Sequence, residues 1–227
     1  MRFLTAAIVA LCAFAVPAAA QTPPSAEELR NYAGLHAAAA KGDVVEIERL
    51  VKSGEKIDIQ DNRSRTPLHV AAYQKKYDAA RTLMRLGANP NALEFQKYDI
   101  ITIAAVADDV EMLKVAIAGG GKATNITSPY VGTALIAAAH LGHDEVVRTL
   151  IKAGAPLDHI NNLHWTALIE SIVLGNGGKR HTESLKALVE AGANVNIADR
   201  NGTTPLALAK GRGYAEMVAI LEKAGAK

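Results

Sequence analysis

Apolar positions recur along this chain with a period of about 33 residues. The period is marked by a Gly-Ala pair, or a close relative of it, at intervals of 33, 33, 34, 38 and 33 residues. The glycines of these pairs are Gly54, Gly87, Gly120, Gly154, Gly192 and Gly225. The chain therefore contains six similar units, and the fifth carries an insertion of about five residues.

Three columns of apolar residues align in one register within these units. The first column is Leu35, Leu68, Ile101, Leu135, Leu168 and Leu206. The second is Ile47, Ala80, Leu113, Val147, Leu185 and Val218, and the third is Leu50, Leu83, Ala116, Leu150, Leu188 and Leu221. The second and third columns are three residues apart, which places them on one face of a helix.

Each unit is predicted to contain a short helix, a tight loop, a second amphipathic helix and a turn at the glycine. Pro67 and Pro205 suit a first helical turn, where the missing N–H has no helical partner to lose. The repeated glycines suit the ends of the second helices, where a positive φ is needed. The polar stretches after them, such as ANVNIADRNG, are typical of hairpin loops. The predicted fold class is an all-α repeat solenoid of stacked helix-loop-helix units joined by hairpin loops.

Three strings carry a resemblance to a known family: RTPLHVAA with LGANPNA, GTALIAAAHLGHDEVVRTLIKAGAPLD, and NGTTPLALAKGRGYAEMVAILEKAGA. Over residues 31–227 the chain resembles the ankyrin repeat family, and the resemblance implies noncovalent binding of another protein through a concave face. The unit around Ile101 departs from the family pattern, since it lacks TPLH and has Gly119 to Lys122 at its end. Its hairpin geometry is left open at this point.

The first residues, MRFLTAAIVALCAFAVPAAAQ, have the layout of a secretory signal peptide. One basic residue precedes an apolar run, which is shorter than the roughly 20 residues of a membrane span, and small residues follow at 18–20. We expect a signal peptide over 1–20, an N-terminal leader over 21–30 and a repeat domain over 31–227. The expected location is the periplasm of a bacterium, with release from the cell as the alternative. Leu11 before the only cysteine, Cys12, does not suit a lipid anchor.

Charge and composition argue against several functional classes. Without residues 1–20 the chain has 24 basic and 23 acidic side chains, a balance that does not indicate nucleic acid or an anionic membrane as partner. No small-molecule substrate or cofactor is evident. No cysteine remains for thiol catalysis, and no Ser, His and acid set marks a nucleophile, so we do not expect an enzyme.

The histidines allow one alternative function. His36 and His69 share the TPLH column, where the resemblance implies that the imidazole bonds the neighbouring threonine and fixes the start of the helix. His140, His143 and His181 flank loops of adjacent units, so a metal-binding protein or metal-dependent enzyme using these three residues is the alternative to protein binding. The inserted segment GNGGKRH, residues 175–181, is expected to extend a loop, either as a tolerated surface insertion or as a contact for an acidic partner.

Aromatic residues near the predicted hairpins are the candidates for partner binding. Exposed Trp and Tyr often anchor interfaces, and we expect Tyr98, Tyr130 and Trp165 to do so here. Phe95 and Tyr73 extend the patch. The polar residues expected to orient the partner are Arg65, Asn162 and Asp199. The alternative is that the aromatic side chains pack on one another.

Overall fold

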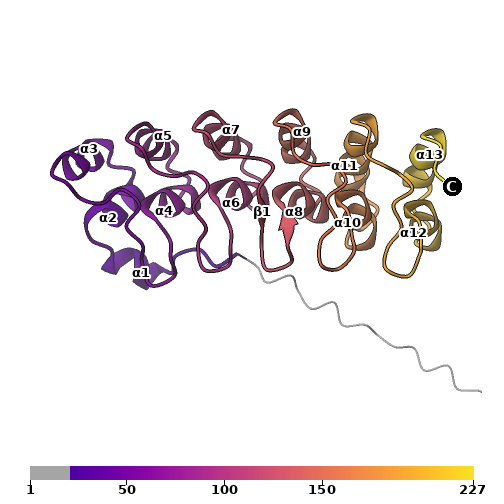
Figure 1. Ribbon diagram of the computed structural model, residues 1–227, viewed down its shortest axis with the longest axis horizontal. Coiled ribbons are helices and arrows are strands. Elements are labelled where there is room, and N and C mark those ends of the chain that lie inside the picture. Colours follow the sequence, from indigo (N-terminus) through magenta and orange to yellow (C-terminus); the bar gives the residue numbers. More distant parts are fainter. Residues whose placement is uncertain (1–20) are drawn as a thin grey trace, which may run out of the picture.

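The computed structural model describes residues 21–227. The predicted signal peptide, residues 1–20, and with it Cys12, lies outside this range. The described part of the chain forms a row of paired helices that runs from one end of the molecule to the other (Figure 1). No helix in residues 21–227 has the length and apolar character needed to cross a membrane.

Each repeat contributes one inner and one outer helix. The inner helices are α2 (Gly34–Lys41), α4 (Pro67–Tyr73), α6 (Ile100–Val106), α8 (Ala134–Leu141), α10 (Ala167–Val173) and α12 (Pro205–Gly211). The outer helices are α3 (Val44–Lys52), α5 (Tyr77–Arg85), α7 (Val110–Ala118), α9 (Asp144–Lys152), α11 (Lys179–Glu190) and α13 (Ala215–Lys223). Inner helices stack on inner helices and outer on outer, as α8 does on α10 and α9 on α11. The predicted solenoid is confirmed.

Three elements of the described residues stand apart from these pairs. The short helix α1 (Ala26–Asn31) precedes the first repeat. Strands β1 (Ile126–Thr127) and β2 (Gly132–Thr133) pair antiparallel in the hairpin before α8, with Ile126 opposite Thr133.

Side chains at the inner-helix starts explain where these helices begin. Thr66 accepts a hydrogen bond from the His69 N–H at the start of α4, and threonine does the same for α8, α10 and α12. In the divergent third repeat Asp99 takes this role, accepting from the Thr102 N–H at 2.8 Å. An N-cap oxygen of either kind satisfies a helical N–H that has no partner within the helix. The repeat that lacks TPLH therefore keeps the same helix.

The predicted register is confirmed by burial. Every residue of the Leu68 column is buried, and so is every residue of the other two columns except Leu50 and Val218. Leu50 in the first repeat and Val218 in the last are half-buried, because an end repeat has a neighbour on one side only. The six column glycines all have positive φ, between 81° and 104°, as their place after the outer helices requires.

The insertion in the fifth repeat differs from its prediction. Only Gly175 to Gly178 extend the loop, while the remaining inserted residues open α11, which has 12 residues where α9 has 9. Within α11, Arg180 contacts Asp108 and Asp144 of earlier repeats. The insertion therefore lengthens an outer helix and bonds to its neighbours.

Candidate functional site

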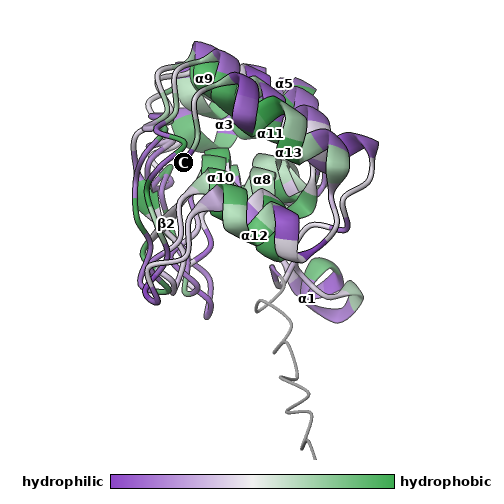
Figure 2. Ribbon diagram, turned by 90° about the vertical axis from the view of Figure 1, so that its right-hand side faces the viewer, coloured by the Kyte–Doolittle hydropathy of each residue, from purple (hydrophilic) through white to green (hydrophobic). Residues whose placement is uncertain are grey.

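The concave face is bounded by the hairpins on one side and the inner helices on the other (Figure 2). In this view the hairpins extend to the left of and below the inner helices, and α1 lies below those helices on the open side. The candidate site is this face: residues 57–66, 88–99, 122–133, 155–166 and 193–204 of the hairpins, together with the inner helices.

Four of the five hairpins share one turn geometry. In the first, the Asp61 carboxylate oxygen Oδ1 accepts hydrogen bonds from the backbone N–H groups of Arg63 and Arg65 at 2.8 and 2.9 Å. Equivalent oxygens belong to Glu94, Asn161 and Asp199. In the remaining hairpin the Ser128 hydroxyl lies 3.3 Å from two such N–H groups. These side chains hold the turns, so Asp61, Glu94 and Asp199 contribute little free charge to the surface.

Neighbouring hairpins are joined by backbone hydrogen bonds. The Phe95 N–H donates to the Arg63 carbonyl at 2.9 Å, and the Ser128 N–H donates to the Lys97 carbonyl at 3.0 Å. The Asn162 N–H then donates to the Tyr130 carbonyl at 3.0 Å. Four consecutive hairpins thus form one connected row, which holds their exposed side chains in fixed relative positions.

The predicted partner-binding residues do not share one environment. Phe95 and Asn162 are exposed, whereas Tyr73, Tyr130, Trp165 and Asp199 are half-buried. Arg65 and Tyr98 are 0% and 6% exposed. The expectation that these two offer free surface to a partner is wrong for this conformation, because their side chains are enclosed by their surroundings.

The burial of Arg65 follows from an ion-pair network. Its Nε donates to Asp61 Oδ2 at 2.8 Å, and its Nη2 donates to Glu28 of α1. The neighbouring Arg63 guanidinium lies 5.0 Å from the ring centroid of Phe95, a cation–π contact. Of the two arginines of this hairpin, Arg63 is the one that reaches solvent.

The hairpins also carry a set of exposed apolar residues that were not predicted from the sequence. Their exposed fractions lie between 39% and 55%, and they occur on four consecutive hairpins. They are Ile59, Leu93, Ile126, Val131, Ile160 and Leu163, beside the predicted Phe95. The signal for them was present, since each is a large apolar residue within an otherwise polar turn segment. Scattered exposed apolar residues are ordinary, but a contiguous set can mark an interaction surface.

The two histidines of the TPLH column have structural contacts. His69 Nδ1 accepts from the Thr66 N–H at 3.1 Å and lies 2.9 Å from the Thr66 hydroxyl, and its Nε2 donates to the Ala92 carbonyl at 3.0 Å. His36 Nε2 lies 2.8 Å from the Arg65 carbonyl. Burial lowers the pKa of His69 to about 4. Both rings tie an inner helix to the hairpin that follows it.

The metal hypothesis is wrong for the described residues. His143 Nδ1 bonds the Ala105 carbonyl at 2.9 Å, and His181 Nε2 bonds the His140 carbonyl at 3.0 Å. His140 itself faces Glu170, with 3.4 Å between Nδ1 and Oε2. Residues 21–227 contain no group of three His, Cys, Asp or Glu side chains that could hold a metal ion. The three rings are instead used in contacts between repeats.

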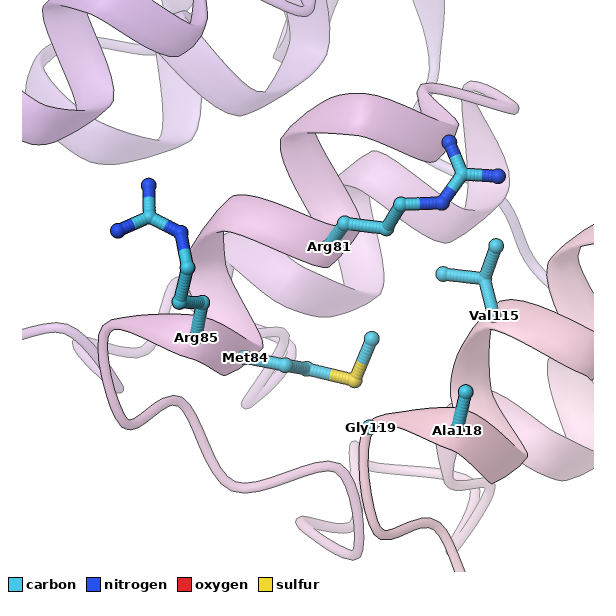
Figure 3. Close-up of a pocket in the computed structure, with 6 residues that line it drawn as sticks. All are labelled: Arg81, Met84, Arg85, Val115, Ala118 and Gly119. Carbon is cyan, nitrogen blue, oxygen red and sulfur yellow. The ribbon is translucent and has the colours of Figure 1, made fainter.

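A groove of about 410 Å³ lies on the opposite, outer side, between α5 and α7 (Figure 3). Met84 points from α5 toward Ala118 and Gly119, while Arg81 and Arg85 diverge to either side. Arg81 pairs with Glu111 at 2.8 Å and Arg85 with Glu48 at 2.5 Å. These arginines are engaged with neighbouring outer helices, so the groove offers few free polar groups to a ligand.

Comparisons with known proteins agree with this architecture. A family model described as ankyrin repeats (3 copies) matches residues 13–94 and 101–199. A putative ankyrin repeat protein of Escherichia coli is 29% identical over 190 residues, which cover 83% of this chain and 94% of that protein. The mouse B-cell lymphoma 3 protein homolog is 28% identical over 199 residues, covering 85% of this chain and 44% of that protein.

A solved structure extends the likeness to three dimensions. It is an ankyrin repeat domain from Acinetobacter baumannii, with 41% sequence identity and a TM-score of 0.81. The alignment covers 85% of this chain and 98% of that domain. Sequence and fold therefore lead to the same family.

Proposed function

The chain belongs to the ankyrin repeat family, and from this we propose that it binds another protein through the hairpins and inner helices of its concave face. Ankyrin repeats mediate protein–protein interaction, and no step of the proposed function requires catalysis. Repeat stacks suit this task because they present an extended surface on a fixed core.

One observation carries the proposal. Four consecutive hairpins, joined to each other by backbone hydrogen bonds, each expose large apolar side chains, among them Ile59, Phe95, Val131 and Leu163 at 40%, 45%, 48% and 39%. Rigid apolar side chains lose little conformational freedom on binding, which favours affinity. The polar atoms between them, such as those of Asn162, provide the hydrogen bonds typical of an interface rim.

Paired capture experiments test this proposal. One variant carries Phe95→Ser and Leu163→Ser on the hairpins. The matched control carries Val45→Ser, at an exposed apolar residue (77%) on the outer helix α3, away from the hairpins and the inner helices. Each chain is immobilised and exposed to an extract of the native organism, and bound proteins are identified by mass spectrometry.

A protein retained by wild type and by the control, but lost from the hairpin variant, is the expected result. Equal retention by all three chains would contradict the placement of the interface on the hairpins. Capture of no protein by the wild-type chain from any cell fraction would count against the binding function itself.

We further propose that the protein acts after export, in the periplasm. The support is the layout of residues 1–20, with a basic start, an apolar run and a small-residue end. Fractionation of the native organism tests this, combined with N-terminal sequencing of the recovered protein. The expected mature chain begins at Gln21 and is found in the periplasmic fraction. Recovery of the full chain from the cytoplasm would overturn export, and recovery from the medium would indicate release.

A further inference from the structure

Residues 21–31 cross the concave face instead of extending away from it. The Gln21 amide Nε2 donates to the Thr102 carbonyl of α6 at 3.0 Å, and the Thr22 N–H donates to Gln96 Oε1 at 3.0 Å. Pro24 is buried, and α1 follows beneath the first inner helices (Figure 1). This N-terminal segment, defined as residues 21–31, therefore runs from the third repeat back to the first along the surface where a partner is expected.

The side chain of Glu28 makes the charged contacts between this segment and the first hairpin. Glu28 Oε1 pairs with Nη2 of Arg65 and lies 3.3 Å from Nε of Arg63. Ser25 fixes this carboxylate in place, since its N–H donates to Glu28 Oε2 at 2.7 Å and its hydroxyl accepts from the Glu28 N–H. Charge-assisted bonds to a guanidinium are among the stronger polar contacts. The first hairpin thus receives an acidic side chain presented at the start of a helical turn.

The polar groups around Arg65 are incompletely paired. Three of the four buried polar side-chain atoms that have no hydrogen-bond partner within the described chain belong to Arg65 and residues near it: Arg65 Nη1, Tyr73 Oη and Glu94 Oε2. A buried polar group without a hydrogen-bond partner destabilises the fold, because it has lost its bonds to water and gained none in return. Burial and then the Glu94 carboxylate raise the pKa of the Tyr73 hydroxyl, whereas the positive charge of Arg65 opposes this rise. The three groups therefore lie close enough to interact, and together they offer a donor, a hydroxyl and an acceptor that the segment leaves unused.

We propose that residues 21–31 are an intramolecular ligand of the concave face, and that an acidic peptide segment of the partner protein displaces them and binds Arg65 and Arg63 in their place. The inference rests on the proposed binding function and adds the chemistry of the ligand. A partner segment that supplies a carboxylate to the guanidinium and hydrogen bonds to the unpaired atoms makes contacts that the N-terminal segment lacks. Binding then includes a competition within the chain, so the apparent affinity depends on how firmly the segment is held.

The first test uses a defined probe and the full chain. A fluorescein-labelled peptide with the sequence of residues 21–31 is titrated into wild type, Glu28→Gln and Glu27→Gln chains, and its anisotropy is measured. Glu27 lies on the same helix and is exposed, which makes Glu27→Gln the matched control. The Glu28→Gln chain should bind the peptide at least about tenfold more tightly than the other two, because loss of a charged hydrogen bond weakens the internal competitor. A peptide that itself carries Glu28→Gln should bind that chain at least about tenfold more weakly.

Equal affinities for the three chains, or no detectable binding to any of them, would overturn the proposal. Circular dichroism first verifies that Glu28→Gln folds. A second measurement needs no variant: excess unlabelled peptide should speed hydrogen exchange at the Thr22 and α1 amides of wild type while exchange in α4 stays unchanged. Unaltered exchange at Thr22 would also overturn it. Both measurements are independent of partner capture, so failure to find a partner is distinguishable from failure of this inference.

Discussion

The guanidinium of Arg180 contacts the carboxylate of Asp108, which lies 72 residues earlier in the chain, at 2.9 and 3.0 Å. Its Nε also donates to Asp144 Oδ1 at 3.0 Å. Asp108 lies between α6 and α7, and Asp144 is the first residue of α9. A residue of the insertion thus joins three consecutive repeats on the edge opposite the hairpins.

The first prediction concerns this contact. Arg180→Met should lower the free energy of unfolding by about 0.5–1 kcal/mol at low ionic strength, because the pairs are partly exposed. The loss should shrink as salt screens the charges. Urea denaturation at two salt concentrations measures it. Lys179→Met removes a neighbouring exposed charge and serves as control, and equal stability of both variants would mean that the Arg180 pairs contribute nothing.

The second prediction concerns pH. Burial holds the pKa of His69 at about 4, whereas an unfolded histidine titrates near pH 6.5. The unfolded chain therefore binds more protons between these values, and stability is lost as pH falls from about 6.5 to 4. For a shift of this size the loss approaches about 3 kcal/mol. Denaturation curves from pH 4 to 7 should be flatter for His69→Gln than for wild type.

His164→Gln provides the comparison for the pH experiment. His164 is exposed on a hairpin, so this substitution should leave the pH dependence of wild type intact. A His69→Gln chain with the same pH dependence as wild type would contradict the assigned neutral role of the His69 ring.

The third prediction tests the repeat register. Leu150 is 0% exposed within the core, and Leu150→Ala should cost roughly 2–5 kcal/mol of unfolding free energy. Leu141→Ala, at a side chain that is 40% exposed, should cost far less. Thermal or urea denaturation of both variants decides this, and a cost below about 1 kcal/mol for Leu150→Ala is incompatible with the core position.

The fourth prediction compares two glycines with similar backbones. Gly142 and Gly202 have φ of 68° and 77°, a region that costs an alanine roughly 1–2 kcal/mol. An added Cβ at Gly142 would lie 2.9 Å from the His181 ring, while at Gly202 nothing lies within 4 Å. Gly142→Ala should therefore destabilise more than Gly202→Ala, since the His181 bond to the His140 carbonyl must shift. Equal losses in urea denaturation would show that the ring moves without cost.

The two expectations that the structure corrected most clearly concern Arg65 and Tyr98. Both occupy the position before the inner-helix start, where the sequence of one repeat predicts an exposed hairpin residue. Arg65 is buried because Asp61 of its own hairpin and Glu28, 37 residues away, both pair with it. No periodic pattern reports the contact with Glu28, because the segment that carries Glu28 stands outside the repeats.

Local signals explain what the sequence by itself determined. The period of the apolar columns, the threonines before the inner helices and the glycines after the outer ones give the number of repeats and their register, and the resemblance to a known family implied the role of His69. Each depends on neighbours along the chain or on the adjacent repeat, so each recurs and is readable.

Only the tertiary structure decided which parts of the concave face are accessible and that the insertion lengthens an outer helix. It also decided that His140, His143 and His181 contact neighbouring repeats and do not form a metal site. Those outcomes depend on single contacts between residues far apart in sequence, such as Arg180 with Asp108 and Gln21 with Thr102. A contact made once leaves no periodicity, and burial is fixed by what folds over a residue and not by the residue type alone.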